Sequence, residues 1–72
     1  MRVELRRKAV GEKSLGELVR SSIGEFESRA AAEAFIEGYI EKYAKRGKEG
    51  QRDYWWCRNE DDKDNLVLWI TW

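Results

Sequence analysis

The chain of 72 residues contains no histidine, no proline and a single cysteine, Cys57. Without histidine there is no imidazole to act as a general base, to activate a nucleophile or to bind a metal. One cysteine cannot form an internal disulfide or a paired thiolate site for zinc. These absences predict a protein that is not an enzyme and has no catalytic residues, no metal ligands and no cofactor.

Long apolar segments are also lacking. No run approaches the ~18 apolar residues that cross a bilayer. The basic N-terminal stretch has no apolar segment of the kind found in a signal peptide. We therefore expect no contact with a membrane, and the lone thiol favours a reducing compartment, the cytoplasm. Basic and acidic residues balance at 14 each, so no strong overall field selects a polyanion.

The length fits a single small domain over residues 1–72. A domain of this size buries a modest fraction of its surface, so it usually needs disulfides, a metal or a partner subunit. With the first two excluded, stability must come from large aromatic side chains or from oligomerisation. The chain carries four tryptophans, three tyrosines and two phenylalanines for this purpose.

A helix is predicted from Arg29 to about Arg46. Ser28 is a good N-cap residue, and Gly47 is a good residue to follow the last turn. Apolar residues recur here at helical spacing and form one stripe, so the helix is amphipathic and buries one side. The stripe consists of Ala32, Phe35, Ile36, Tyr39, Ile40 and Tyr43.

Two segments near the C-terminus, residues 54–57 and 66–72, are rich in aromatic and β-branched residues. They flank the polar turn 59–65, and this arrangement predicts a β-hairpin. Polar and apolar residues alternate over residues 1–10, which favours another strand. Residues 48–52 are polar and predict a loop.

Residues 14–24 are compatible with two interpretations. Ser14 and Glu17 form a capping box, which favours a short helix. Gly16 and Gly24 are weak helix formers, and we prefer a strand that leads into the main helix. The predicted fold is then an α+β domain with an antiparallel sheet of three or four strands, in the order β-β-α-β-β. One amphipathic helix covers one face of that sheet.

The C-terminal hairpin suggests a function. A single helix covers one face of the sheet only, and the hairpin is apolar on both faces. If Trp55 lies opposite Trp69, the outer face carries an uncovered apolar patch, which is typical of an interaction site. A helix over residues 14–24 would instead cover these tryptophans. The patch predicts an interaction module, such as a bacterial or phage adaptor or inhibitor, that binds itself as a homodimer or binds another protein. Its expected contact residues are Trp55, Cys57, Val67, Trp69 and Thr71.

Binding of single-stranded nucleic acid is the second hypothesis. Basic clusters accompany the aromatic residues of the predicted sheet, and a sheet with exposed aromatics is one way to bind single strands. The balanced net charge makes this function second to protein binding. The basic residues expected to contact nucleic acid are Arg2, Arg6, Arg7, Lys45 and Arg46.

Overall fold

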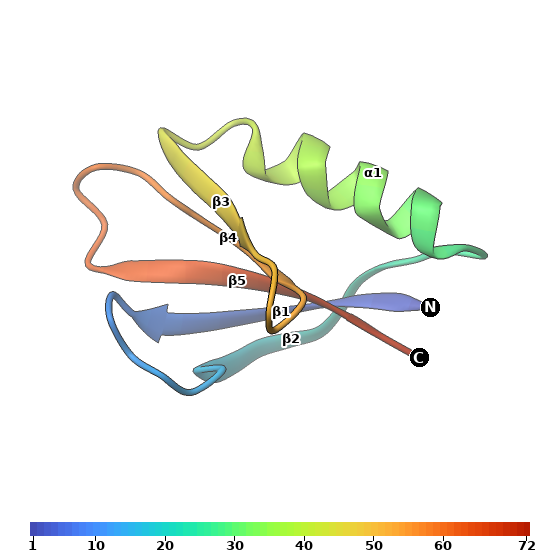
Figure 1. The fold of residues 1–72 in the computed structure, drawn as a ribbon, viewed down its shortest axis with the longest axis horizontal. Helices are drawn as coiled ribbons and strands as arrows, with labels where there is room; N and C mark the ends of the chain where they lie inside the picture. Colours follow the sequence, from blue (N-terminus) through green and yellow to red (C-terminus); the bar gives the residue numbers. More distant parts are fainter.

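Five antiparallel strands and one helix follow one another in the order β-β-α-β-β-β in the computed structural model, which describes all residues 1–72 (Figure 1). The helix packs on one face of the sheet, as the amphipathic stripe predicted. The prediction of three or four strands was wrong, because the sheet has a fifth. The elements are β1 (Arg2–Ala9), β2 (Glu17–Glu25), α1 (Arg29–Ile40), β3 (Lys45–Glu49), β4 (Tyr54–Arg58) and β5 (Asp64–Thr71).

The additional strand, β3, lies where we expected the end of the helix and a loop. The helix ends at Ile40, with Glu41 as its C-cap, so it does not continue to Arg46. Residues 45–49 turn back and pair with β4 along its whole length. The physical reason is that β4 is largely buried, and its main-chain groups on that edge need hydrogen-bond partners.

Residues 17–25 form a strand, which confirms the preferred interpretation, and the alternative short helix is wrong. Ser14 does not cap a helix: its Oγ accepts a hydrogen bond from the Gly16 N–H across 3.1 Å, within the turn between β1 and β2. Gly16 has a φ of 82° and lies against the Arg7 carbonyl, where a Cβ atom would have no room. Only glycine satisfies both conditions.

The sheet order is β2-β1-β5-β4-β3, so the N-terminal strand pairs with the C-terminal strand in the middle of the sheet. The main core lies between this sheet and α1, whose Ala32, Ile36 and Ile40 are buried. Ser28 caps the helix as predicted, because its Oγ accepts from the Ala31 N–H across 3.2 Å. The sheet contributes Val3, Leu5, Trp55, Cys57, Leu68 and Ile70 to this core.

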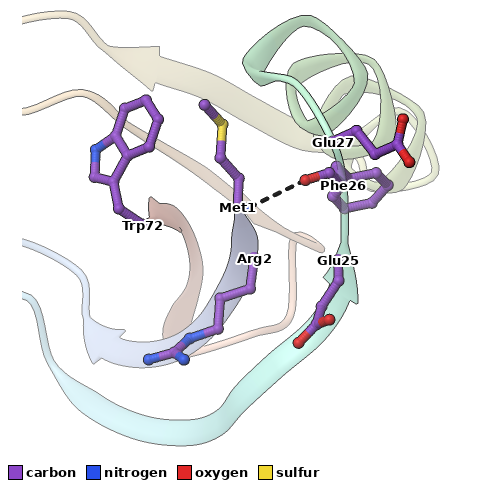
Figure 2. A pocket seen from close by; sticks show the side chains of 6 residues that line it. All are labelled: Met1, Arg2, Glu25, Phe26, Glu27 and Trp72. Carbon is purple, nitrogen blue, oxygen red and sulfur yellow. Dashed lines mark hydrogen bonds between the residues drawn. The ribbon is translucent and has the colours of Figure 1, made fainter.

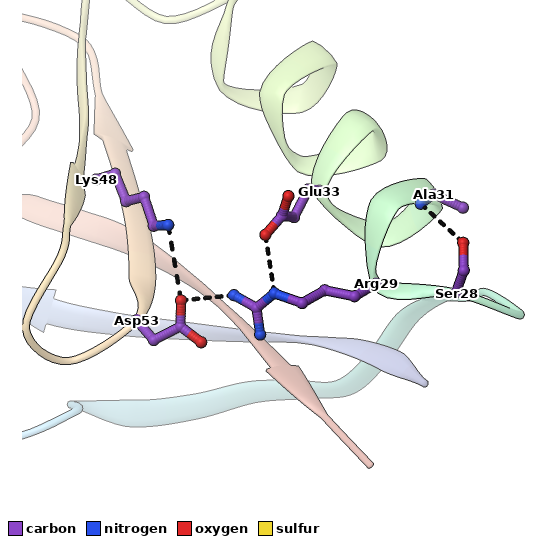
Figure 3. A network of polar contacts seen from close by, with 6 residues as sticks. All are labelled: Ser28, Arg29, Ala31, Glu33, Lys48 and Asp53. Atoms are coloured by element: carbon purple, nitrogen blue, oxygen red, sulfur yellow. Dashed lines mark hydrogen bonds and ion pairs between the residues drawn. The ribbon is translucent and has the colours of Figure 1, made fainter.

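An ion-pair network joins the start of α1 to the turn between β3 and β4 (Figure 3). The Arg29 guanidinium lies 2.6 Å from the Asp53 carboxylate and 2.8 Å from the Glu33 carboxylate. The Lys48 ammonium lies 3.7 Å from the same Asp53 oxygen. The hydrogen bond from Arg29 lowers the pKa of Asp53, so this carboxylate is charged near neutral pH.

The one helix, α1, is too short and too polar to span a membrane.

Candidate functional site

The pairing of β4 with β5 decides which hairpin side chains face outward. Tyr54 lies opposite Trp69, and Trp55 lies opposite Leu68. The expected pairing of Trp55 with Trp69 was therefore wrong by one residue. Because successive side chains of a strand point to opposite faces, this difference moves Trp55 to the other side of the sheet.

The predicted contact residues are consequently divided between two faces. Trp55 and Cys57 belong to the core under α1, where Lys48 Nζ lies 4.8 Å from the Trp55 ring centre. Val67, Trp69 and Thr71 alternate with core residues of β5 and face outward. Burial, with a smaller contribution from Asp62, raises the pKa of the Cys57 thiol to about 11, so the thiol stays protonated near neutral pH.

The outer face is partly covered by the protein itself. Val67 is fully buried and Tyr54 nearly so, although both point away from α1. The sheet is strongly twisted, and β3 and β4 run steeply across the direction of β1 (Figure 1). Lys8 on β1 reaches across β5 and donates a hydrogen bond to Tyr54 Oη on β4 across 3.0 Å. The uncovered apolar patch predicted from the sequence is therefore not formed.

Trp56 is one of two half-buried tryptophans on this face, together with Trp69. Its indole lies across the neighbouring strand, over Gly47, which is its direct partner on β3. A Cβ atom at Gly47 would lie 2.9 Å from the indole Nε1. Gly47 thus provides the space for the Trp56 ring, and it does not terminate the helix as expected.

Two cations lie side by side next to Trp56. Lys45 on β3 and Arg58 on β4 are direct cross-strand partners, two residues beyond the Gly47–Trp56 pair. Like charges in this position destabilise a sheet. Neither residue takes part in any of the four ion pairs of the structure. The positive charge of this pair is therefore not neutralised by a direct contact with a carboxylate.

Unused hydrogen-bonding groups gather on the same face. The side-chain atoms that are buried without a partner are Arg58 Nε, Asn65 Oδ1 and Thr71 Oγ1, and all three residues point outward. Asn65 lies one residue beyond the Cys57–Leu66 pair, next to Arg58, and it pairs with Lys8 on its other side. The outer face thus combines a row of polar and basic groups with an adjacent aromatic ring. We call Lys45, Trp56, Arg58 and Asn65 the outer-face site.

The basic residues predicted from the sequence are also divided. Arg2, Arg6 and Lys45 face outward, whereas Arg7 and Arg46 lie on the side of α1. Arg6 is already occupied, since it pairs with Glu4 at 2.5 Å and donates to the Gly16 carbonyl at 2.9 Å.

Sequence reasoning missed Trp56 and Arg58 as outward-facing residues. Cys57, which lies between them, carried the available signal: a small apolar residue in this strand is usually buried. Its burial turns both neighbours to the outer face. The sequence pattern did not show which strand would lie beside them.

A separate hollow of about 340 Å³ lies beside the chain ends (Figure 2). The Met1 ammonium closes one wall by donating to the Phe26 carbonyl across 3.0 Å. The hollow contains no group from the outer-face site. Its lining residues are Met1, Arg2, Glu25, Phe26, Glu27 and Trp72.

Comparisons of this chain with protein-family models, with curated proteins and with solved structures find no match.

Proposed function

We propose that the outer face of the sheet binds single-stranded nucleic acid, with Trp56 stacking on a base and Lys45 and Arg58 contacting phosphate. One observation carries this proposal: two cross-strand cations without a carboxylate partner lie beside a tryptophan on the face that α1 leaves open. Single-strand binding sites combine these two features, a positive groove and aromatic side chains on which bases stack.

The distribution of charge supports the proposal despite the balanced total. The acidic residues of α1, Glu33 and Glu37, lie on the opposite side of the molecule from the outer face. The outer face carries three acidic residues, Glu4, Glu25 and Glu49, but they are outnumbered there by five basic ones. These are Arg2, Arg6, Lys8, Lys45 and Arg58. Asp62, in the loop between β4 and β5, and Asp64, the first residue of β5, line a hollow with Tyr43. Tyr43 packs against the core under α1, so this hollow opens on the helix side. A polyanion that approaches the outer face experiences the local charge of that face more strongly than the net charge of the whole protein.

Trp69 provides a second aromatic surface on the same face. Trp69 lies opposite Tyr54, and Val67, two residues earlier on β5, lies opposite Trp56. Trp69 and Trp56 are therefore diagonal neighbours. Such diagonal neighbours are separated by about 7–8 Å, so each ring offers a stacking surface to a different base of one extended strand. Each base–aromatic contact is worth about 1–3 kcal/mol. Because every base has a π-face, binding by stacking needs no sequence-specific readout.

Fluorescence anisotropy with labelled deoxythymidine and uridine homo-oligomers tests the proposal. Neutralising both cations with Lys45→Gln and Arg58→Gln should weaken binding and flatten its salt dependence. The slope of log K against log salt should fall by about 1.4, at about 0.7 per phosphate contact on a single strand. Arg7→Gln with Arg46→Gln is the matched control, because it removes the same charge from the other side and should leave the slope unchanged.

The aromatic contribution is tested separately. Trp56→Ala should cost about 1–3 kcal/mol of binding free energy through lost stacking, with the salt slope unchanged. No detectable binding of either oligomer at low salt would refute the proposed function.

Binding of a protein partner at the same face is the second candidate. Trp56 and Trp69 are half-buried and keep some apolar surface open to a partner. A complex captured through this face whose affinity does not change with salt would favour this candidate. In either case we propose a non-enzymatic protein of the cytoplasm, where a lone cysteine is common.

A further inference from the structure

A hollow of about 200 Å³ lies between the loop that joins β1 to β2 and the loop that joins β3 to β4. Its buried lining includes Lys8 and Tyr54, which are only 8% and 7% exposed. Its exposed lining includes Lys13 from the first loop and Arg52 from the second. The Arg52 guanidinium donates to the Lys13 carbonyl and so joins the two loops beside the hollow. We call this space the loop hollow.

The two buried side chains of the loop hollow have donors to spare. An ammonium has three N–H groups. That of Lys8 uses two of them, one for the Glu12 carbonyl at 3.1 Å and one for Tyr54 Oη at 3.0 Å. Tyr54 Oη accepts this bond and makes no other, so its own O–H is free to donate. One N–H and one O–H at the buried end therefore lack an acceptor.

The charge of the buried ammonium is not compensated by a carboxylate. None of the four ion pairs of the structure includes Lys8, Lys13 or Arg52. Glu12 and Glu49 also line the loop hollow, but both are exposed and neither forms an ion pair. Three cations thus accompany two carboxylates, and the buried member of the group is a cation. Because buried charges are usually paired, this end of the hollow favours an anion.

We propose that the loop hollow binds a phosphate group. Lys8 and Tyr54 donate to it from the buried end. Lys13 and Arg52 donate from the two loops, and lysine and arginine are the side chains that bind phosphate through strong, charge-assisted hydrogen bonds. A tetrahedral anion presents oxygens on several sides, which suits donors that converge from different segments. The volume of the hollow is several times the ~30 Å³ that a water molecule takes up in the liquid, so the anion has room.

Two sources supply this chemistry. One is the free anion. The other is a backbone phosphate of a single strand bound at the outer face, because Lys8 pairs with Asn65 of the outer-face site. The second source rests on the function proposed above, whereas the first does not.

Titration with inorganic phosphate at constant ionic strength, followed by NMR of the backbone amides, tests the site. Saturable shifts should concentrate on the two loops and on the residues around Lys8 and Tyr54. Lys8→Met should weaken the affinity about tenfold or more, because it removes a charged donor at the buried end. Circular dichroism checks that this variant is folded.

Exposed positions give a test that does not depend on the stability of Lys8→Met. Lys13→Gln should weaken phosphate binding about two- to fivefold, the effect of one exposed charge. Glu12→Gln should strengthen binding by a similar factor, because it removes a repelling carboxylate and keeps the main-chain carbonyl that holds Lys8. Lys63→Gln is the matched control: this exposed cation lies in the loop between β4 and β5, and its loss should leave the affinity unchanged.

Deoxythymidine homo-oligomers distinguish the two sources. If the hollow takes a backbone phosphate, Lys13→Gln should lower the slope of log K against log salt by about 0.7. If it takes the free anion, Lys13→Gln should weaken phosphate binding alone. Oligomers that fail to bind the wild type would refute the proposed function, and binding of inorganic phosphate would still support the loop hollow.

Two results would overturn the inference. One is the absence of saturable shifts around the loop hollow together with oligomer binding that Lys13→Gln does not change. The other is an equal response of phosphate binding to Lys13→Gln and to Lys63→Gln, which would show a general effect of charge and no site.

Discussion

The Lys8 ammonium lies 3.0 Å from Tyr54 Oη, although the two residues are 46 positions apart in the chain. A second hydrogen bond, of 3.1 Å, joins the same ammonium to the Glu12 carbonyl. Lys8 is the one buried charged residue of the protein, and its contacts tie the first hairpin to β4 across the outer face. A buried ammonium is stable only while its hydrogen bonds are made.

Tyr54→Phe should therefore destabilise the fold by about 1–3 kcal/mol, because it removes one partner and leaves the buried cation in place. Lys8→Met added to Tyr54→Phe should recover part of this loss, since an apolar pair of similar shape leaves no unsatisfied charge. Urea denaturation of the wild type, of Tyr54→Phe, of Lys8→Met and of the double variant measures the coupling free energy between Lys8 and Tyr54. Strictly additive effects would contradict a direct contact.

Replacing glycine by alanine should destabilise the fold at one position near β3 and leave its stability unchanged at another. Gly47→Ala places a methyl group 2.9 Å from the Trp56 indole, so the ring must move. We expect a loss of about 1–3 kcal/mol, as for overpacking elsewhere. Gly50→Ala is the control: nothing lies within 4 Å of the new Cβ, and the change should stay within about 0.5 kcal/mol. Thermal denaturation followed by tryptophan fluorescence measures both, and equal losses would contradict the placement of Trp56.

Neighbouring residues of α1 should also respond differently to truncation. Ile36 is fully buried against the sheet, and Ile36→Ala should cost about 2–5 kcal/mol. Glu37 is exposed, and Glu37→Ala should change stability by less than about 0.5 kcal/mol. Chemical denaturation of both variants tests which side of the helix faces the core, and similar shifts would show that the assignment is wrong.

Alkaline pH should destabilise the protein through Cys57. Burial raises the pKa of its thiol to about 11 in the folded state, whereas an unfolded chain has a pKa of about 8.5. The folded state therefore holds this proton more tightly, and the resulting stability is complete below about pH 8.5 and is lost as the pH rises toward 11.

Denaturation midpoints across this pH range provide the measurement. Cys57→Ala should be less stable at neutral pH, because it leaves a cavity, but its stability should depend less on pH between 8.5 and 11. Tyr43, whose pKa is raised to about 12 mainly by burial, supplies the alkaline dependence that remains in the variant. Equal slopes for the wild type and the variant would exclude Cys57 as the source.

The sequence alone determined the local elements. Ser28 and the apolar stripe after it located the start and the buried side of α1, because capping and helical periodicity act within a few residues. Aromatic and β-branched runs located β4 and β5, and Gly16 with Gly24 correctly disfavoured a helix over residues 14–24.

The tertiary structure decided the strand β3 and the faces of the hairpin. Residues 45–49 have weak strand character of their own, and they become a strand because the buried edge of β4 needs main-chain partners. Alternation told us that Trp55 and Trp56 lie on different faces, but only the pairing with β5 and the position of α1 assigned each face. A shift of one residue exchanges those faces, and no local pattern in a strand that is apolar on both sides can fix that shift. The juxtaposition of Lys45 with Arg58 followed from the same long-range pairing, and for this reason the outer-face site could not be predicted from the sequence.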